Sequence, residues 1–302
     1  MTNQNEYLKS TKLITAHYGE EYEHYYNAIV PPVFMNSLNV FETLEDYYDF
    51  DRTDKHKYCY GRVQNPTVRI LEDKIAALEH GVGALAFASG MAAATTAVLT
   101  ACKAGSHVVC LHNAYGPLKD FLSKYCTEHL DITLTYVTGD RVEEFEEAVT
   151  DATDLIVLES PSSVLFSLQD IRAVSRIARK HQALVYKDNT FCTPIYQQPL
   201  DMGAAIVMHT PSKNIGGHSD LIGGMLAVKD QELMKLLTAN REILGGIVGP
   251  MEASTLIRGL RTLAVRLAAP QHAATEGAQF LEASPNAQHA HSHGHTPPPP
   301  HG

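Results

Sequence analysis

Short apolar runs that alternate with helical patterns constrain the fold of this chain more than any other feature. The runs are HVVCL at 107–111, TLTYV at 133–137, LIVLE at 155–159, ALVYK at 183–187 and AIVM at 205–208. Helical patterns lie between them, for example at residues 168–181. Strands that are apolar at every position are typical of parallel sheets covered by helices on both faces. The sequence therefore predicts an α/β fold with a mostly parallel central sheet.

The segment QNPTVRILEDKIAALEHG carries the signals of a complete helix. Asn65 suits the N-cap, because its side chain can accept hydrogen bonds from free backbone N–H groups, and Pro66 suits the first helical position. Apolar residues then follow at helical spacing. Gly81 is expected to end this helix.

The two ends of the chain differ from this pattern. Residues 1–60 include Pro31 and Pro32, and we expect them to form an extended N-terminal arm with little core of its own. Residues 61–268 form the expected large domain. The helical pattern weakens from residue 271 and ends in NAQHAHSHGHTPPPPHG, which cannot build a core. Residues 269–302 are therefore expected to be a disordered, histidine- and proline-rich tail.

Composition and charge argue against several classes of partner. The chain has 302 residues, 44% of them hydrophobic, and a formal net charge of −10 without a basic groove, so no nucleic-acid partner is expected. It has no run of 18 apolar residues, and its polar start, MTNQNEYLKS, indicates neither a membrane span nor a signal peptide. The five cysteines contain no CxxC pair and indicate reduced thiols, so we expect a cytoplasmic protein.

We predict no metal site. The spaced histidines of the tail could bind a transition metal weakly. No acid or cysteine nearby completes a defined site, however, which favours a disordered segment without a metal.

Polar residues gather where predicted strands end and helices begin, which is where open parallel sheets bind ligands. Ser89, Gly90 and Met91 open a helix, where free N–H groups and the helix dipole suit a phosphate. Glu159 and Asp188 each follow a strand directly. Taken alone, the first feature could be an ordinary tight turn, and each carboxylate could be the cap of the next segment.

The segment VMHTPSKNIGGHSD places a single amine, that of Lys213, among hydroxyl and glycine residues after a buried run. Lys213 alone could be a solvated loop lysine. A pyridoxal cofactor, however, needs an amine for its aldehyde, an acid opposite its pyridine nitrogen and an anion site for its phosphate. Lys213, Asp188 and the Gly90–Met91 turn can fill these three roles.

Six motifs, in order along the chain, resemble those of the Cys/Met-metabolism family of pyridoxal-phosphate enzymes. The family includes cystathionine synthases and lyases, methionine γ-lyase and O-acylhomoserine sulfhydrylases. The motifs are YGRVQNPT, AFASGMAA, NAYGP, LESPSS, KDNTFCTP and HTPSKNIGGHSDLIGG, and the resemblance covers residues 10–268. It implies a type I (aspartate-aminotransferase-like) fold with an incomplete small C-terminal domain, and pyridoxal 5'-phosphate as the cofactor.

The resemblance also implies roles for individual residues. Lys213 would bind the cofactor covalently and move the Cα proton of the substrate. Asp188 would pair with the pyridinium nitrogen, and Tyr115 would stack on the ring and assist acid–base chemistry. Tyr60 and Arg62 would reach the phosphate of a neighbouring subunit, which implies a homodimer or homotetramer. The cofactor-binding set is completed by the expected phosphate cradle: Ser89, Gly90, Met91, Thr210 and Ser212.

Two departures from the family's pattern bear on activity. Ser163 stands where the family has an asparagine near the phenolic oxygen of the cofactor, and a serine has a shorter reach. The arginine that binds the substrate carboxylate in the family's C-terminal domain is expected to be absent, and no motif transfers its role to Arg258, Arg261 or Arg266. Losing this clamp should reduce turnover more than cofactor binding.

The expected function is β- or γ-elimination by a carbon–sulfur lyase that acts on an amino acid such as cystathionine, methionine or cysteine. Two alternatives stay open. One is γ-replacement of the cystathionine γ-synthase or O-acylhomoserine sulfhydrylase type. The other is a non-catalytic relative that retains the cofactor fold.

Overall fold

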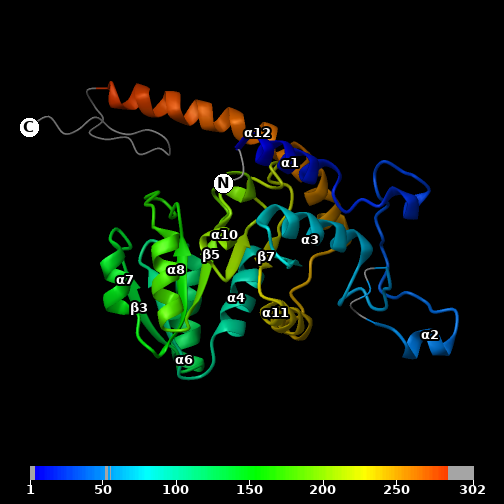
Figure 1. Cartoon of the computed structure of the whole chain (residues 1–302), viewed down its shortest axis with the longest axis horizontal. Helices are drawn as coiled ribbons and strands as arrows, with labels where there is room; N and C mark the ends of the chain where they lie inside the picture. The colour runs from blue at the N-terminus through cyan, green and yellow to red at the C-terminus, as the bar shows by residue number, and fades with distance from the viewer. Residues whose placement is uncertain (1–3, 52–53, 55, 285–302) are drawn as a thin grey trace, which may run out of the picture.

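One seven-stranded sheet forms the centre of the computed structural model, which describes residues 4–51, 54 and 56–284 (Figure 1). The strands are β1 (Gly83–Phe87), β2 (His107–Leu111), β3 (Thr133–Val137), β4 (Thr153–Glu159), β5 (Leu184–Asp188), β6 (Ile206–His209) and β7 (Gly224–Val228). Their order in the sheet is β1-β7-β6-β5-β4-β2-β3. β7 runs antiparallel to both neighbours, and the other adjacent pairs are parallel. The expected α/β fold with a mostly parallel sheet is confirmed.

The five apolar runs all form strands, with small shifts in their bounds. β2 and β3 match the predicted residues, β4 begins earlier, at Thr153, and β5 and β6 lie one residue later than predicted. The shifts make Asp188 and His209 the last residues of their strands. β1 and β7 escaped prediction, because GALAF and GMLAV are rich in glycine and alanine, which have low β propensity.

Helices α3 (Pro66–Glu79), α4 (Gly90–Ala101), α8 (Ile171–Lys180) and α11 (Gln231–Leu244) pack against this sheet (Figure 1). Every position of β6 and β7 is buried, which requires cover on both faces of the sheet. None of the described helices combines the length and apolar character needed to cross a membrane. The shorter segments are η1 (Tyr22–Tyr25), α2 (Leu44–Tyr48), α5 (Gly116–Asp120), the π-helix η2 (Phe121–Cys126), α6 (Thr127–His129), α7 (Val142–Ala148), α9 (Thr193–Tyr196) and α10 (Pro199–Met202).

Helix α3 begins as predicted and ends one residue earlier than expected. The side chain of Asn65 accepts hydrogen bonds from the backbone N–H groups of Thr67 and Val68, at 2.9 and 3.3 Å. At the other end, the residue in the left-handed conformation is His80, with φ of 58°, rather than Gly81. Gly81 is needed for another reason: a Cβ atom there would lie 2.7 Å from the carbonyl oxygen of Val228.

The N-terminal arm contains a helix that the sequence analysis did not predict. Residues Gln4–His17 form α1, which packs against α3 and against the long helix α12 (Pro250–Glu282) (Figure 1). The expectation of a wholly extended arm was wrong for these residues. Of the side chains described in α1, Thr11 and Thr15 are buried and Ile14 is partly buried, so polar residues interrupt the apolar pattern that would reveal this helix.

Helix α12 corrects the expected disorder after residue 268. It continues through Pro270 to Glu282 and lies along α1 in Figure 1, where α12 is orange and α1 is blue. An internal proline opposes a helix by about 3 kcal/mol, but the segment after it is rich in alanine, glutamine and glutamate, and Ala278 is buried. Residues 285–302, the rest of the expected disordered tail, lie outside the described residues.

A buried ion cluster joins the arm to both of these helices. The carboxylate of Glu20 lies 3.0 Å from Lys74 Nζ of α3 and 2.7 Å from a guanidinium nitrogen of Arg261 on α12. The side chains of Glu20 and Lys74 are fully buried. Burial lowers the pKa of Lys74, whereas the hydrogen bond to Glu20 raises it. One carboxylate thus compensates two cations, and the arm is fixed to the large domain by charge as well as by packing.

Glu20→Gln should destabilise the fold, because it leaves the buried Lys74 and the partly buried Arg261 without an anion. We expect the free energy of unfolding to fall by about 3 kcal/mol, since breaking one partner of a buried pair is strongly destabilising. Urea denaturation measures this change. The matched control is Asp120→Asn, which removes an exposed pair with Lys124 and should change stability by less than about 1 kcal/mol. Equal losses in the two variants would contradict the role of Glu20.

Candidate active site

A cavity of about 190 Å³ opens at the carboxyl ends of β4, β5 and β6, beside the start of α4. Eight of the ten predicted site residues line it: Ser89, Gly90, Met91, Tyr115, Asp188, Thr210, Ser212 and Lys213. Their strands and helices lie far apart in sequence, and the sheet topology brings them together. The other two, Tyr60 and Arg62, do not line this cavity.

The start of α4 forms one wall of the cavity. Ser89 is its N-cap, and its hydroxyl accepts a hydrogen bond from Ala92 N at 3.0 Å. A Cβ atom on Gly90 would collide with the hydroxyl of Thr210, so only a glycine lets α4 approach the end of β6 this closely. The N–H groups of a first helical turn have no partner within the helix, and together with the helix dipole they favour an anion.

Asp188 and Tyr186 lie on the same side of β5, because strand side chains alternate. The backbone N–H of Thr190 donates to Asp188 Oδ1 at 2.9 Å, and the Thr190 hydroxyl accepts a hydrogen bond from Thr210 N at 2.8 Å. Thr190 therefore links the ends of β5 and β6. The sequence analysis missed Thr190, although it lies two residues after Asp188 in the motif KDNTFCTP.

Glu159, at the end of β4, fixes the segment that carries Tyr115. Its carboxylate accepts hydrogen bonds from Tyr115 N at 2.7 Å and from the Ser163 hydroxyl at 2.6 Å. Burial, followed by the nearby carboxylate of Asp188, raises the pKa of Glu159 above its usual value, while these two hydrogen bonds lower it. Ser163 is thus held by a carboxylate, even though it also lines the cavity.

Lys213 lies in the loop after β6 with an exposed side chain. Its Nζ atom is 5.7 Å from the centre of the Tyr115 ring, within the range of a cation–π contact. The neighbouring Ser212 hydroxyl accepts a hydrogen bond from Gly223 N at 3.0 Å and holds the loop against the chain that enters β7. An exposed amine beside an aromatic ring at the mouth of a cavity can act as a nucleophile or as a base.

An arginine of α12 supports this loop from behind. The Arg266 guanidinium donates hydrogen bonds to the backbone carbonyls of Asn214 and Ile215, at 2.8 and 3.0 Å, and to that of Gly259 at 2.8 Å. Arg261 is paired with Glu20, and Arg258 is exposed. None of these three arginines lines the cavity, which agrees with leaving the substrate-carboxylate role unassigned.

Tyr60 and Arg62 interact with each other instead of with the cavity. The guanidinium carbon of Arg62 lies 5.2 Å from the centre of the Tyr60 ring, and the side chain donates a hydrogen bond to the carbonyl of Glu242. Tyr60 also pairs with Leu38 in an isolated antiparallel bridge. Their predicted role toward a neighbouring subunit therefore stays a prediction.

A buried polar network lies on the opposite side of β5 and was not predicted. Glu79 Oε1, at the end of α3, lies 2.6 Å from His209 Nε2 and accepts a hydrogen bond from Asn189 Nδ2 at 3.0 Å. Lys187 Nζ donates to Asn189 Oδ1 at 3.2 Å, and burial lowers the pKa of Lys187 to about 8. These four polar residues lie within the apolar patterns of α3 and of the strands, so the patterns do not reveal the network. The one available signal was that Asn189 and His209 are adjacent in sequence to Asp188 and Thr210.

The cavity fits the cofactor implied by the sequence. It offers an amine, a carboxylate and a helix start suited to a phosphate, and its wall includes a polar group that is open to a ligand. That group is the buried hydroxyl of Tyr186, which has no hydrogen-bond partner among the described residues. Burial raises the pKa of Tyr186 well above its usual value, so this hydroxyl stays protonated and can donate.

Comparisons with known proteins agree with this site. The sequence model of the family described as Cys/Met metabolism PLP-dependent enzyme matches residues 10–299. The chain is 34% identical to a probable cystathionine gamma-synthase from Herpetosiphon aurantiacus, covering 90% of this chain and 82% of that protein. It is 39% identical to the cystathionine gamma-lyase of Bacillus subtilis (strain 168), covering 76% of this chain and 60% of that protein.

A solved structure shares the fold. The crystal structure of metB from Corynebacterium glutamicum superposes with a TM-score of 0.86 at 34% identity, covering 91% of this chain and 69% of that one. The expected type of fold, the family resemblance and pyridoxal 5'-phosphate as the cofactor are thereby confirmed. The chain belongs to the Cys/Met-metabolism family of pyridoxal-phosphate-dependent enzymes.

Proposed function

We propose that this chain is a carbon–sulfur lyase that eliminates a β or γ substituent from an amino acid such as cystathionine, methionine or cysteine. The observation that carries the proposal is the single cavity whose wall combines Lys213, Asp188 and the start of α4. The 39% identity to a cystathionine gamma-lyase supports elimination in particular.

Each wall of the cavity has a role in this proposal. Bound pyridoxal phosphate supplies a sink for the electrons that remain when Cα loses its proton. The first turn of α4, with Ser89, and the hydroxyls of Thr210 and Ser212 hold the phosphate group. The Asp188 carboxylate would stabilise the proton on the pyridine nitrogen, since an adjacent anion favours a charged ring.

The proton transfers fall to Lys213 and Tyr115. The Nζ atom of Lys213 would hold the cofactor through its aldehyde, and the amine would serve as the base for the Cα proton of the substrate. Tyr115 would help to hold the cofactor, and its hydroxyl would assist the proton transfers. Glu159 accepts a hydrogen bond from Tyr115 N and so holds this segment beside the cavity.

A γ-replacement reaction is the second candidate. It is favoured by the 34% identity to a probable cystathionine gamma-synthase. That match covers 82% of the synthase, whereas the lyase match covers 60% of the lyase. A non-catalytic relative is the third candidate, because none of the three arginines of α12 lines the cavity. The chain spans 60% of the lyase, so activity itself is part of the proposal.

Assembly and location are also proposed. We expect a homodimer or homotetramer in which Tyr60 and Arg62 complete the cofactor site of a neighbour. All five cysteines are free, which supports a reducing, cytoplasmic location.

Release of ammonia and a 2-oxo acid from cystathionine, methionine or cysteine tests the proposal directly. Turnover should vanish in Lys213→Ala, because no other cavity residue supplies an amine. Borohydride reduction and mass spectrometry should find the cofactor on Lys213 in the parent chain and on no lysine in the variant. Lys180→Ala, at the exposed end of α8, is the control and should behave like the parent. A parent chain that binds cofactor but releases no product would favour the non-catalytic candidate.

Asp188→Asn should slow removal of the Cα proton by orders of magnitude, because the pyridine nitrogen loses its anionic partner. The amide oxygen can still accept the Thr190 N–H bond, so the fold and the covalent attachment of the cofactor should persist. Exchange of the substrate Cα proton with deuterated solvent, followed by NMR, measures the step. The control is Asp151→Asn, whose side chain is 96% exposed. An unchanged exchange rate would make Asp188 a structural cap only.

Arg62→Ala should weaken cofactor binding and assembly together. Hydrogen bonds to charged groups contribute about 1.5–3 kcal/mol, so cofactor affinity should fall about ten- to hundredfold. Sedimentation of the parent should show an oligomer that the cofactor stabilises, since a ligand favours the state that binds it. Arg176→Ala, an exposed arginine of α8, should change neither property. A monomer that binds cofactor tightly and is indifferent to Arg62→Ala would contradict the shared site.

A further inference from the structure

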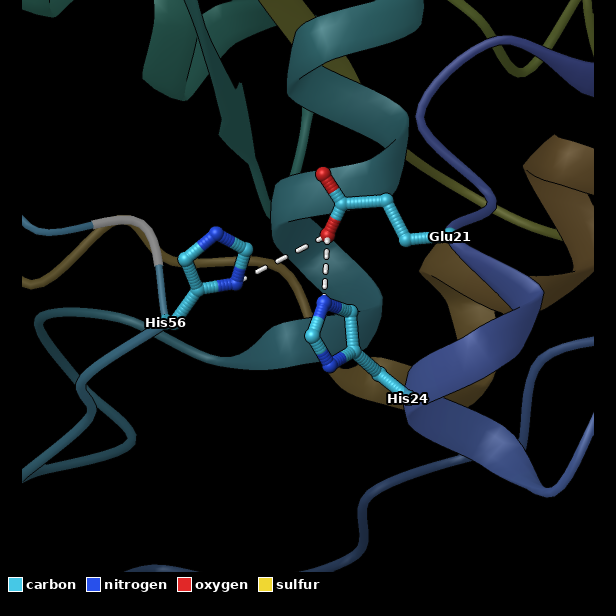
Figure 2. Close-up of side chains that lie close together, drawn as sticks. All are labelled: Glu21, His24 and His56. Atoms are coloured by element: carbon cyan, nitrogen blue, oxygen red, sulfur yellow. Dashed lines mark ion pairs between the residues drawn. The ribbon is translucent and has the colours of Figure 1, made fainter.

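Three potential metal ligands converge in the N-terminal arm, away from the cavity. Glu21, His24 and His56 each turn one ligand atom toward a common point, and all of these atoms lie within 4.8 Å of one another (Figure 2). Among the described residues, this is the one cluster of three or more such side chains. The sequence did not predict it, because His56 is more than thirty residues from the other two.

Local structure fixes the position of each ligand. Glu21 precedes the single turn of η1, and the backbone N–H of His24 donates to its carbonyl at 3.0 Å. Residues three apart on such a turn lie on the same side, so both side chains face outward together. His56 follows Asp54, whose carboxylate accepts a hydrogen bond from His56 N at 2.9 Å. The rings of His24 and His56 then meet, with their centres 5.0 Å apart.

The spacing of the ligand atoms suits an ion better than it suits direct hydrogen bonds. Glu21 Oε2 lies 3.9 Å from His24 Nε2 and 3.7 Å from His56 Nδ1. Both distances exceed those of an N–H···O hydrogen bond. Two ligands of a tetrahedral Zn²⁺ ion, each bonded at about 2.0–2.1 Å, lie about 3.3 Å apart. The three side chains are about half exposed, so small rotations can close the remaining gap.

We propose that Glu21, His24 and His56 form a binding site for a divalent transition metal ion, and that Zn²⁺ is the ion that fits these three donors best. Two imidazoles and one carboxylate are a donor set typical of Zn²⁺, with water in the fourth position. Mg²⁺ prefers oxygen ligands and should not bind. Each imidazole must be neutral to bind the ion, so binding releases any proton that it carries.

A bound ion would join two parts of the arm that are far apart in sequence. One part is the turn that follows Glu20, which is anchored by the buried ion cluster. The other is the segment from residue 56 to 62, which carries Tyr60 and Arg62. A bound ion would therefore tie the segment that carries these two residues to the anchored base of the arm.

The experiment must separate this site from the histidines near the C-terminus. The parent for the test is therefore the full chain with His289, His291, His293, His295 and His301 all changed to Gln, positions outside the described residues. Equilibrium dialysis of this chain against ZnCl₂, followed by metal analysis, should find one Zn²⁺ per chain and none when MgCl₂ replaces ZnCl₂. Zn²⁺ should also raise the thermal unfolding temperature.

Matched variants then assign the ligands. His24→Ala, His56→Ala and Glu21→Gln should each weaken Zn²⁺ binding at least tenfold and remove the rise in unfolding temperature. His129→Ala, an exposed histidine of α6, should bind Zn²⁺ like the parent. The proposal is overturned if the parent binds no Zn²⁺, or if the double variant His24→Ala/His56→Ala binds it unchanged.

Discussion

The rest of the site depends on how the buried carboxylate of Glu79 is paired. Its Oε1 atom contacts Asn189 and His209, which come from the ends of two adjacent parallel strands. Asn189 follows Asp188 directly, and His209 directly precedes Thr210. A carboxylate in the core requires such partners, because an unpaired buried charge is strongly unfavourable. The pairing of Glu79 thus lies directly beside two residues that line the cavity, Asp188 and Thr210.

The loop of Lys213 depends in turn on α12. Arg266 donates hydrogen bonds to two backbone carbonyls of the loop. A Cβ atom on Gly259 would collide with the carbonyl oxygen of Ile215, so the backbones of the helix and the loop are in direct contact. The same helix carries Arg261, one of the two cations that Glu20 compensates. The same helix therefore contacts both the loop of Lys213 and the anchored arm.

Much of this organisation could be predicted from the sequence, and the exceptions have physical reasons. The apolar runs revealed five strands, and the motifs identified eight residues that line one cavity, because strand ends and helix starts are local features. Helix α1 was missed, since Thr11 and Thr15 are among its buried side chains and interrupt the apolar pattern. The roles of Glu79 and Arg266 were missed because they follow from pairings between distant segments, as does the link from Thr190 to Thr210. Hydrophobic periodicity reports local secondary structure and does not reveal such contacts.

The charges around the cavity explain why a second chain is part of the proposal. Lys213 is the one basic side chain among the residues that line it, whereas Glu159 and Asp188 contribute two carboxylates. A phosphate brings a charge of about −1.5 to −2 near neutral pH, and a helix start offers the equivalent of only about half a positive charge. Burial raises the pKa of Glu159, and its side chain supplies no cation. Arg62 of the same chain is engaged with Tyr60 and Glu242 outside this cavity, so it adds no cation to the lining of its own site. A cation from a neighbouring subunit, as proposed for Arg62, would offset the remaining negative charge.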